Sequence, residues 1–169
     1  VLPAYRHLAY TEADLPIGHE ETILTPIISA KIIEALEIRS NETVLEVGTG
    51  TGYLTALLAH FAKKVTSLEC IPELSATAQT NLSRLNIHNV DIKVQNVFDA
   101  SNQGEKTLTQ YDHIIFTGSM SSLPEHIKKQ LKLNGKLLAF LGKPPVFCAT
   151  LFTFVESNHW TKKSLFETL

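Results

Sequence analysis

The sequence predicts an α/β fold in which a mostly parallel, doubly wound sheet is followed by a C-terminal antiparallel hairpin. Three observations support this prediction. Short apolar segments typical of buried strands alternate with segments of helical periodicity through residues 25–142, which is the pattern of a parallel sheet covered by helices on both faces. A glycine-rich turn at residues 48–52 joins the first of these strands to a helix. Residues 143–169 contain two consecutive strand-like segments, as a hairpin requires.

Length and composition are those of one globular domain, residues 1–169. The formal charge of −2 leaves no broad basic surface for nucleic acid, and no apolar run approaches the ~18 residues that a membrane span needs. We therefore expect a cytoplasmic monomer with no nucleic-acid or membrane partner. Cys70 and Cys148 are isolated thiols, so neither a disulfide framework nor a zinc site is expected. The chain begins at Val1 without an initiator methionine, and we expect both ends to be trimmed relative to the natural protein.

The elements follow one another as this fold requires. Residues 1–24 show little periodicity and contain prolines and a glycine, which predicts a surface loop on the substrate side of a core formed by residues 25–142. Thr25 and Pro26 suit the N-cap and first position of a helix. The later elements are strands at 44–47, 64–69, 90–94, 112–116 and 136–141, helices at 54–60, 72–85 and 124–133 with Asn134-Gly135 as the C-cap of the last, and hairpin strands at 147–155 and 159–166 around Ser157-Asn158.

The turn after the first strand is the most informative motif. Glycines at 48, 50 and 52 precede a helix, and free backbone N–H groups at a helix N-terminus form a cradle for a nucleotide-like ligand. A dinucleotide fingerprint would need glycine at position 53, which is Tyr53. Glu46 lies two residues before the first glycine and suits a ligand with a cationic amino group and no pyrophosphate. S-adenosylmethionine fits this description, and a tight turn without a ligand is the alternative.

Polar residues also follow the next strands. Glu69 lies 21 positions after Gly48, close to the offset of about 20 residues at which an acid reaches the ribose hydroxyls. Asn96 follows the third strand, where its amide suits an adenine ring, and Thr117 follows the fourth strand at the expected floor of the pocket. Glu69 and Asn96 could each instead be an ordinary polar residue at a strand end.

Several segments resemble one known family, the protein-L-isoaspartate O-methyltransferases. The segments are His7-Leu-Ala-Tyr10, Leu15-Pro-Ile-Gly18-His19, Thr22-Ile23 with Pro26, Val44 to Leu57, Tyr111 to Gly118, Leu131 to Lys136 and Ser164 to Thr168. The resemblance implies a Rossmann-like class I S-adenosylmethionine-dependent methyltransferase fold. It also implies protein repair, in which the methyl group passes to the free carboxylate of an L-isoaspartyl or D-aspartyl residue in a damaged protein or peptide and leaves S-adenosylhomocysteine.

The resemblance also implies roles for individual residues. Glu46 and the glycine turn would hold the methionine end, Glu69 the ribose, and Asn96 with Val97 the adenine. Thr22 would close over the cofactor beside the acceptor and, with position 24, form the catalytic site. The expected cofactor-binding residues are Thr22, Ile23, Glu46, Gly48, Thr49, Gly50, Thr51, Gly52, Tyr53, Glu69, Cys70, Asn96, Val97 and Thr117.

The chain departs from the family pattern near the acceptor. Leu24 replaces a serine whose hydroxyl serves the acceptor site, and Glu20 and Glu21 replace small or neutral residues. Asn96 stands where the family has an acidic residue, and Val97 where it has glycine. A carboxylate acceptor is already ionised at neutral pH and needs no general base. Loss of one hydroxyl that bonds a charged acceptor costs roughly 1.5–3 kcal/mol, on the order of 10- to 150-fold in rate.

These departures leave three alternatives to repair of isoaspartate. The first is a methyltransferase with another acceptor, the second is a domain that binds S-adenosylmethionine without catalysis, and the third, disfavoured by Tyr53, is a nicotinamide dehydrogenase. Seven histidines show no metal-ligand spacing, so no metal is expected. His19 is the one histidine with a functional claim, because it falls in the substrate-side loop, and an ordinary surface histidine is the alternative. No G-x-S-x-G nucleophile motif is present.

Overall fold

The computed structural model describes residues 1–99, 109–156 and 159–168. Within these ranges the main sheet has seven strands in the order β5-β4-β3-β6-β7-β8-β9. Strands β3 to β7 pair in parallel, and β8 and β9 pair antiparallel at one edge, which confirms the predicted α/β class. The strands are β3 (Thr43–Val47), β4 (Lys64–Glu69), β5 (Val90–Val94), β6 (Tyr111–Met120), β7 (Leu131–Lys143), β8 (Val146–Glu156) and β9 (His159–Thr168).

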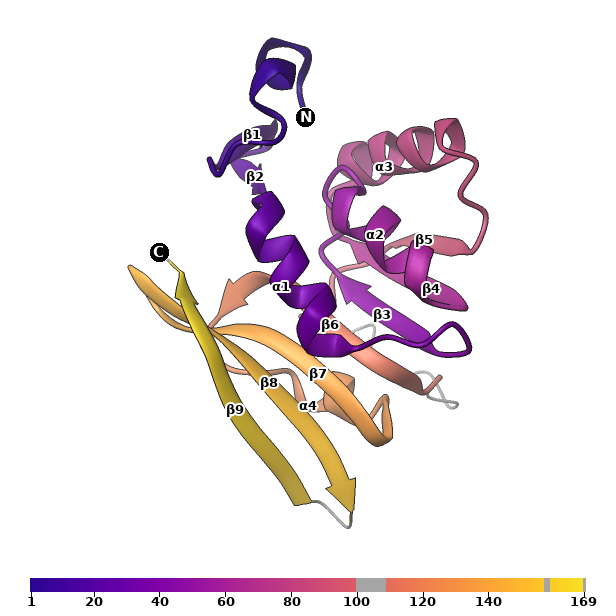
Figure 1. Ribbon diagram of the computed structural model, residues 1–169, viewed down its shortest axis with the longest axis vertical. Helices are drawn as coiled ribbons and strands as arrows, with labels where there is room; N and C mark the ends of the chain where they lie inside the picture. The colour runs from indigo at the N-terminus through magenta and orange to yellow at the C-terminus, as the bar shows by residue number, and fades with distance from the viewer. Residues whose placement is uncertain (100–108, 157–158, 169) are drawn as a thin grey trace.

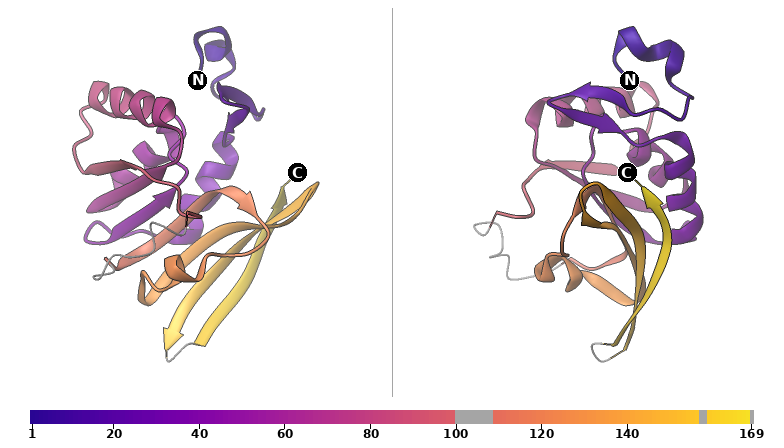
Figure 2. Two further views of the ribbon diagram at one scale, coloured as in Figure 1. Left: turned by 180° about the vertical axis from the view of Figure 1, so that it is seen from behind. Right: turned by 90° about the vertical axis from the view of Figure 1, so that its left-hand side faces the viewer.

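Helices cover both faces of the sheet (Figure 1). Helices α1 (Pro26–Leu36) and α2 (Tyr53–Phe61) pack on one face, where Ile32 and Leu58 join Val44 of β3 in a fully buried cluster. The short helix α4 (Glu125–Lys128) covers the other face through Ile127. Helix α3 (Pro72–Arg84) contacts β4 and β5. Figure 2 shows that β7 to β9 extend away from α2 and α3.

The strands alternate between these two clusters as period-two geometry requires. Val44 faces the helices α1 and α2, whereas its neighbour Leu45 faces the cluster around α4. Ile114 and Ile115 of β6 divide in the same way. All four side chains are essentially inaccessible to solvent, so both faces of the central strands are buried, which explains why these strands read as continuous apolar runs.

The predicted helix at 124–133 is wrong over most of its length. Only Glu125–Lys128 is helical, and β7 begins at Leu131. Asn134 and Gly135 therefore do not cap a helix but form an irregularity inside β7, where Leu131 pairs with Tyr111 and Lys136 with His113. Asn134 has φ = 63°, and a Cβ on Gly135 would lie 2.7 Å from the carbonyl oxygen of Asp112. The Asn-Gly pair thus supplies a left-handed kink, as predicted of these residue types, but in a bulged strand.

The predicted loop at the N-terminus is also only partly correct. Residues Pro3–Leu8 form a 3-10 helix, and β1 (Leu15–Gly18) and β2 (Glu21–Ile23) form a separate antiparallel hairpin. This N-terminal hairpin lies beyond the N-terminal end of α1 (Figure 1). Its two turn residues are His19 and Glu20, both with positive φ. Such turns usually contain Asn or Gly, so the sequence carries no local signal for this hairpin.

The C-terminal strands match the predicted hairpin, whereas its turn at Ser157-Asn158 lies outside the described residues. Among the helices that the structure describes, none combines the length and apolar character required to cross a bilayer.

Candidate functional site

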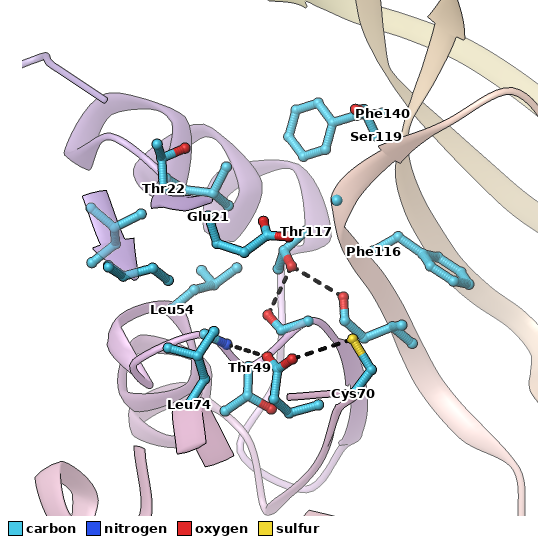
Figure 3. Close-up of a pocket in the computed structure, with 18 of the residues that line it drawn as sticks. Glu21, Thr22, Thr49, Leu54, Cys70, Leu74, Phe116, Thr117, Ser119 and Phe140 are labelled. Atoms are coloured by element: carbon cyan, nitrogen blue, oxygen red, sulfur yellow. Dashed lines mark hydrogen bonds between the residues drawn. The ribbon is translucent and has the colours of Figure 1, made fainter. Parts of the chain in front are cut away.

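A cavity of about 510 Å³ lies at the carboxyl ends of β3, β4, β5 and β6. This is the edge at which open parallel sheets bind ligands. The glycine turn and the strand ends form its base, and the N-terminal hairpin forms one wall. Phe140 from β7 (Figure 3) and Phe147 from β8 contribute an aromatic wall. The cavity is within the size range of small-molecule and cofactor sites.

The glycine turn is held against β6 and α3. Gly48 has φ = 101°, and a Cβ there would lie 2.0 Å from Thr117 Oγ1. The Thr117 hydroxyl is 2.8 Å from the carbonyl oxygen of Gly48 and 3.1 Å from that of Val47, to which it donates. Gly52 has φ = 87°, and a Cβ there would lie 3.2 Å from Ala78 Cβ. These contacts leave room for glycine only, so the turn approaches its neighbours closely and keeps its backbone at the cavity.

Glu69 is fixed by two backbone N–H groups. Its Oε2 accepts from Gly50 N–H at 2.7 Å, and its Oε1 accepts from Ile71 N–H at 3.0 Å. The residue is only 5% exposed, yet it lines the cavity. Burial raises the pKa of the neighbouring Cys70 thiol, and the Glu69 carboxylate raises this pKa further. Glu69 therefore presents a preorganised anionic acceptor at the end of β4.

Glu46 lies behind the cavity wall and does not line it. The residue has no exposed surface, and its Oε2 accepts from Thr55 Oγ1 at 2.5 Å and Ser67 Oγ at 2.6 Å. Burial raises the pKa of this carboxyl to about 7. Its Oε1 has no hydrogen-bond partner among the described residues. Ser67 in turn bonds Thr49, which does line the cavity, so Glu46 supports the glycine turn through a chain of hydroxyls.

The residues after β5 also reach the cavity. Asn96 and Val97 both line it, and Val97 is 3% exposed. Asn96 Oδ1 accepts from Phe98 N–H at 2.9 Å, which orients the amide in a local turn. Thr51 of the glycine turn and Tyr53 at the start of α2 also line the cavity.

The N-terminal hairpin brings the predicted acceptor residues to the cavity. Thr22, Ile23 and Leu24 line it, and Leu24 also packs against the core beside α1. Glu21 lines it as well, with its side chain directed inward (Figure 3), whereas Glu20 does not line it.

The structure thus gathers most of the predicted cofactor-binding residues around one cavity. Those that line it are Thr22, Ile23, Gly48, Thr49, Gly50, Thr51, Tyr53, Glu69, Cys70, Asn96, Val97 and Thr117. Glu46 and Gly52 stand behind the wall. Sequence reasoning missed Asp14, Phe140 and Phe147 as wall residues. The phenylalanines carry no local signal, because only the pairing of β7 with β6 and of β8 with β7 brings them there.

The charged side chains among the described residues of the cavity wall are all acidic. Its described ionisable side chains include the carboxylates of Asp14, Glu21 and Glu69, and no lysine, arginine or histidine is among the described lining residues. No cluster of histidine, cysteine, aspartate or glutamate in the described parts of the chain has the arrangement of a metal site. The site therefore suits a ligand with cationic groups.

Comparison with solved structures defines the class of this fold as that of the Rossmann-like methyltransferases. A putative protein-L-isoaspartate O-methyltransferase from Plasmodium falciparum, in complex with S-adenosyl-L-homocysteine, matches with a TM-score of 0.81 and 26% identity over 95% of this chain and 79% of the other. An S-adenosylmethionine-dependent O-methyltransferase from Thermotoga maritima shares the fold with a TM-score of 0.59 at 22% identity, over 72% of this chain and 46% of the other.

The family model for protein-L-isoaspartate(D-aspartate) O-methyltransferase matches residues 1–158. The chain belongs to this family, which confirms the resemblance seen in the sequence. The protein-L-isoaspartate O-methyltransferase of Dictyoglomus turgidum is 41% identical over 138 residues, which cover 82% of this chain and 61% of the relative. That of Methanoculleus marisnigri is 38% identical over 149 residues, or 88% of this chain and 65% of the relative. The chain thus spans somewhat less than two thirds of these relatives' length.

Proposed function

We propose that this chain is the S-adenosylmethionine-binding, catalytic part of a methyltransferase that esterifies the free carboxylate of L-isoaspartyl or D-aspartyl residues in damaged proteins. The observation that carries the proposal is the family match over residues 1–158, together with a cavity lined by the glycine turn and Glu69. Residues 1–24, 25–142 and 143–169 would then act as one methyltransferase domain.

The residues present fit the cofactor. The close approach of Gly48 to Thr117 keeps the turn free of side chains that would fill the cavity. Glu69 would accept from the ribose hydroxyls with lone pairs that its two backbone donors leave available. Asn96 and Val97 would border the adenine, and Thr22 and Ile23 would close the cavity from the hairpin. Glu46 would act indirectly, through Ser67 and Thr49.

When bound, S-adenosylmethionine supplies a methyl group on a sulfonium. A carboxylate oxygen of the acceptor forms the new C–O bond as the C–S bond breaks, and the electron pair of that bond goes to sulfur. No proton moves, because the acceptor is ionised at neutral pH. The protein's contribution is to align acceptor and methyl group and to exclude water. Leu24 and Phe140, both at the cavity, would serve this exclusion.

The partner in this proposal is a protein or peptide that carries isoaspartate, and the location is cytoplasmic. The two isolated cysteines support a reducing compartment, since neither forms a disulfide.

A second candidate is methyl transfer to an acceptor that is not a carboxylate. Leu24 supplies no hydroxyl, and the described wall contains carboxylates but no cationic side chain that would balance an anionic acceptor. A neutral nucleophile would avoid this repulsion.

The test combines binding with turnover. Calorimetry with S-adenosylhomocysteine establishes the pocket, and transfer of labelled methyl groups is then measured for an isoaspartyl peptide and its aspartyl counterpart. We expect binding, and label in the isoaspartyl peptide only. Binding without label in either peptide rejects the repair function. Label in a different acceptor would then select the second candidate, and no turnover on any acceptor would leave a binding domain.

A further inference from the structure

The position of Glu46 leaves the cationic end of the proposed cofactor without its expected partner. S-adenosylmethionine and S-adenosylhomocysteine both carry an α-ammonium group. Glu46 is fully buried, does not line the cavity, and uses its Oε2 for Thr55 and Ser67. Its raised pKa of about 7 further reduces its negative charge at neutral pH. A different carboxylate on the wall must therefore meet the ammonium group if it is paired with an anion.

Three described wall residues carry a carboxylate, namely Asp14, Glu21 and Glu69. Glu69 is held by Gly50 N–H and Ile71 N–H at the end of β4, which is the place expected for the ribose. Asp14 lies before β1, in the connection from the N-terminal 3-10 helix. Glu21 is the first residue of β2 and has no hydrogen bond or ion pair of its side chain among the interactions of the described residues.

The side chain of Glu21 is directed from the hairpin into the cavity (Figure 3). The negative charge of Glu21 acts on Cys70, another residue of the cavity wall, and is one of the effects that raise the pKa of its thiol. Glu21 pairs with Gly18 and Thr22 with Pro16, so the pairing of β1 with β2 holds this part of the hairpin against the cavity. The turn residues His19 and Glu20 lie before β2, and neither lines the cavity.

We propose that Glu21 is the counter-ion of the cofactor's α-ammonium group, supplied by the N-terminal hairpin from across the cavity. This inference rests on the proposed function. It assigns to Glu21, a departure from the family pattern, the role that the sequence had suggested for Glu46. The hairpin would then bind the cofactor as well as cover it.

The pairing also bears on the acceptor. Before the cofactor binds, the carboxylate of Glu21 opposes the entry of an anionic acceptor. Once the ammonium group neutralises it, that repulsion is removed. The cofactor should therefore bind before an isoaspartyl peptide, and an acidic wall residue becomes compatible with a carboxylate substrate.

The experiment measures affinities by calorimetry for Glu21→Gln and for the control Glu20→Gln. The ligands are S-adenosylhomocysteine, its analogue that lacks the α-amino group, and adenosine. We expect Glu21→Gln to weaken S-adenosylhomocysteine about tenfold, as loss of a charge-assisted hydrogen bond does, and to change the other two by less than about twofold. Glu20→Gln should leave all three affinities unchanged.

Unchanged affinity of Glu21→Gln for S-adenosylhomocysteine would overturn the inference, and so would an equal loss for the analogue without the amino group. Retained adenosine binding reports that the variant pocket is folded. The wild-type chain separates this result from the proposed function, because failure of the wild type to bind S-adenosylhomocysteine would reject the cofactor site itself.

Discussion

Gly48 and Thr117 approach each other so closely that a Cβ on residue 48 would lie 2.0 Å from Thr117 Oγ1. Gly48 directly follows β3, and Thr117 belongs to the neighbouring parallel strand β6, at the edge where the cavity opens. The Thr117 hydroxyl also donates to the carbonyl oxygen of Gly48. This contact joins the glycine turn to the floor of the cavity. The shape of the site therefore depends on glycine at residue 48.

Gly48→Ala should destabilise the fold and weaken binding of S-adenosylhomocysteine. The left-handed φ costs about 1 kcal/mol or more for a residue with a Cβ, and the clash with Thr117 adds to this cost. Urea denaturation measures the change. Gly118→Ala is the matched control, because a Cβ at residue 118 meets no heavy atom within 4 Å. In Gly48→Ala/Thr117→Ala the nearest Thr117 atom is removed and the next lies at 3.4 Å, so part of the stability should return. Equal stability of Gly48→Ala and wild type would contradict this prediction.

Glu46→Gln should increase stability more at alkaline than at acidic pH. Burial raises the pKa of Glu46 from 4.5 to about 7, so the folded state retains a proton that the unfolded state has lost. Stability from this group is complete below pH 4.5 and is lost as the pH rises through about 7, on the order of 3 kcal/mol in all. Glutamine carries no charge and removes this loss. The measurement is the difference in unfolding free energy between variant and wild type at about pH 5 and pH 8, and a difference that does not change with pH would count against the prediction.

Leu24→Ser should raise the rate of methyl transfer to an isoaspartyl peptide. The serine hydroxyl restores a hydrogen bond to the charged acceptor, for which we expect an increase of about tenfold or more in kcat/KM. Leu24 is half-buried beside the core, so the smaller side chain also reduces packing. Leu24→Ala reproduces this loss of volume without a hydroxyl and is the proper reference. Equal rates for the serine and alanine variants would show that the hydroxyl has no part in the reaction.

Glu69→Gln should weaken the binding of adenosine about tenfold or more. The carboxylate accepts from Gly50 N–H and Ile71 N–H on separate oxygens, whereas an amide has only one acceptor oxygen and its NH₂ group would face a donor. The turn and the ribose contact are then disturbed together. Calorimetry with adenosine checks this, and Glu21→Gln is the contrasting variant because its effect requires the amino group. Adenosine affinity equal to wild type would refute the assignment of Glu69 to the ribose side.

The sequence best predicted those elements whose formation depends on residues close to them in the sequence. The strand at 90–94 and the start of α1 at Thr25-Pro26 match the structure, since Thr25 Oγ1 accepts from Ile28 N–H as an N-cap. Gly48, Gly50 and Glu69 likewise meet at one cavity, because strands of a parallel sheet end at the same edge. Here local pattern and general topology were sufficient.

The predictions that failed concern residues whose conformation depends on distant partners. Residues 131–133 were predicted as the end of a helix but belong to β7, where Leu131 pairs with Tyr111 of β6. His19 and Glu20 form a tight hairpin turn without the residues that usually mark one. Pairing between strands outweighed local preference in both cases.

The sequence by itself determined the fold class and the edge of the sheet at which the site lies. The family pattern in the sequence also predicted most of the residues of that site. The tertiary structure alone decided which carboxylates line the cavity. Glu46 is withdrawn because the hydroxyls of Thr55 and Ser67 hold it in the interior, whereas the pairing of β1 with β2 brings Glu21 to the cavity wall. The physical reason is that the direction of a side chain is set by contacts between segments far apart in the chain, and residue type and spacing carry no record of those contacts.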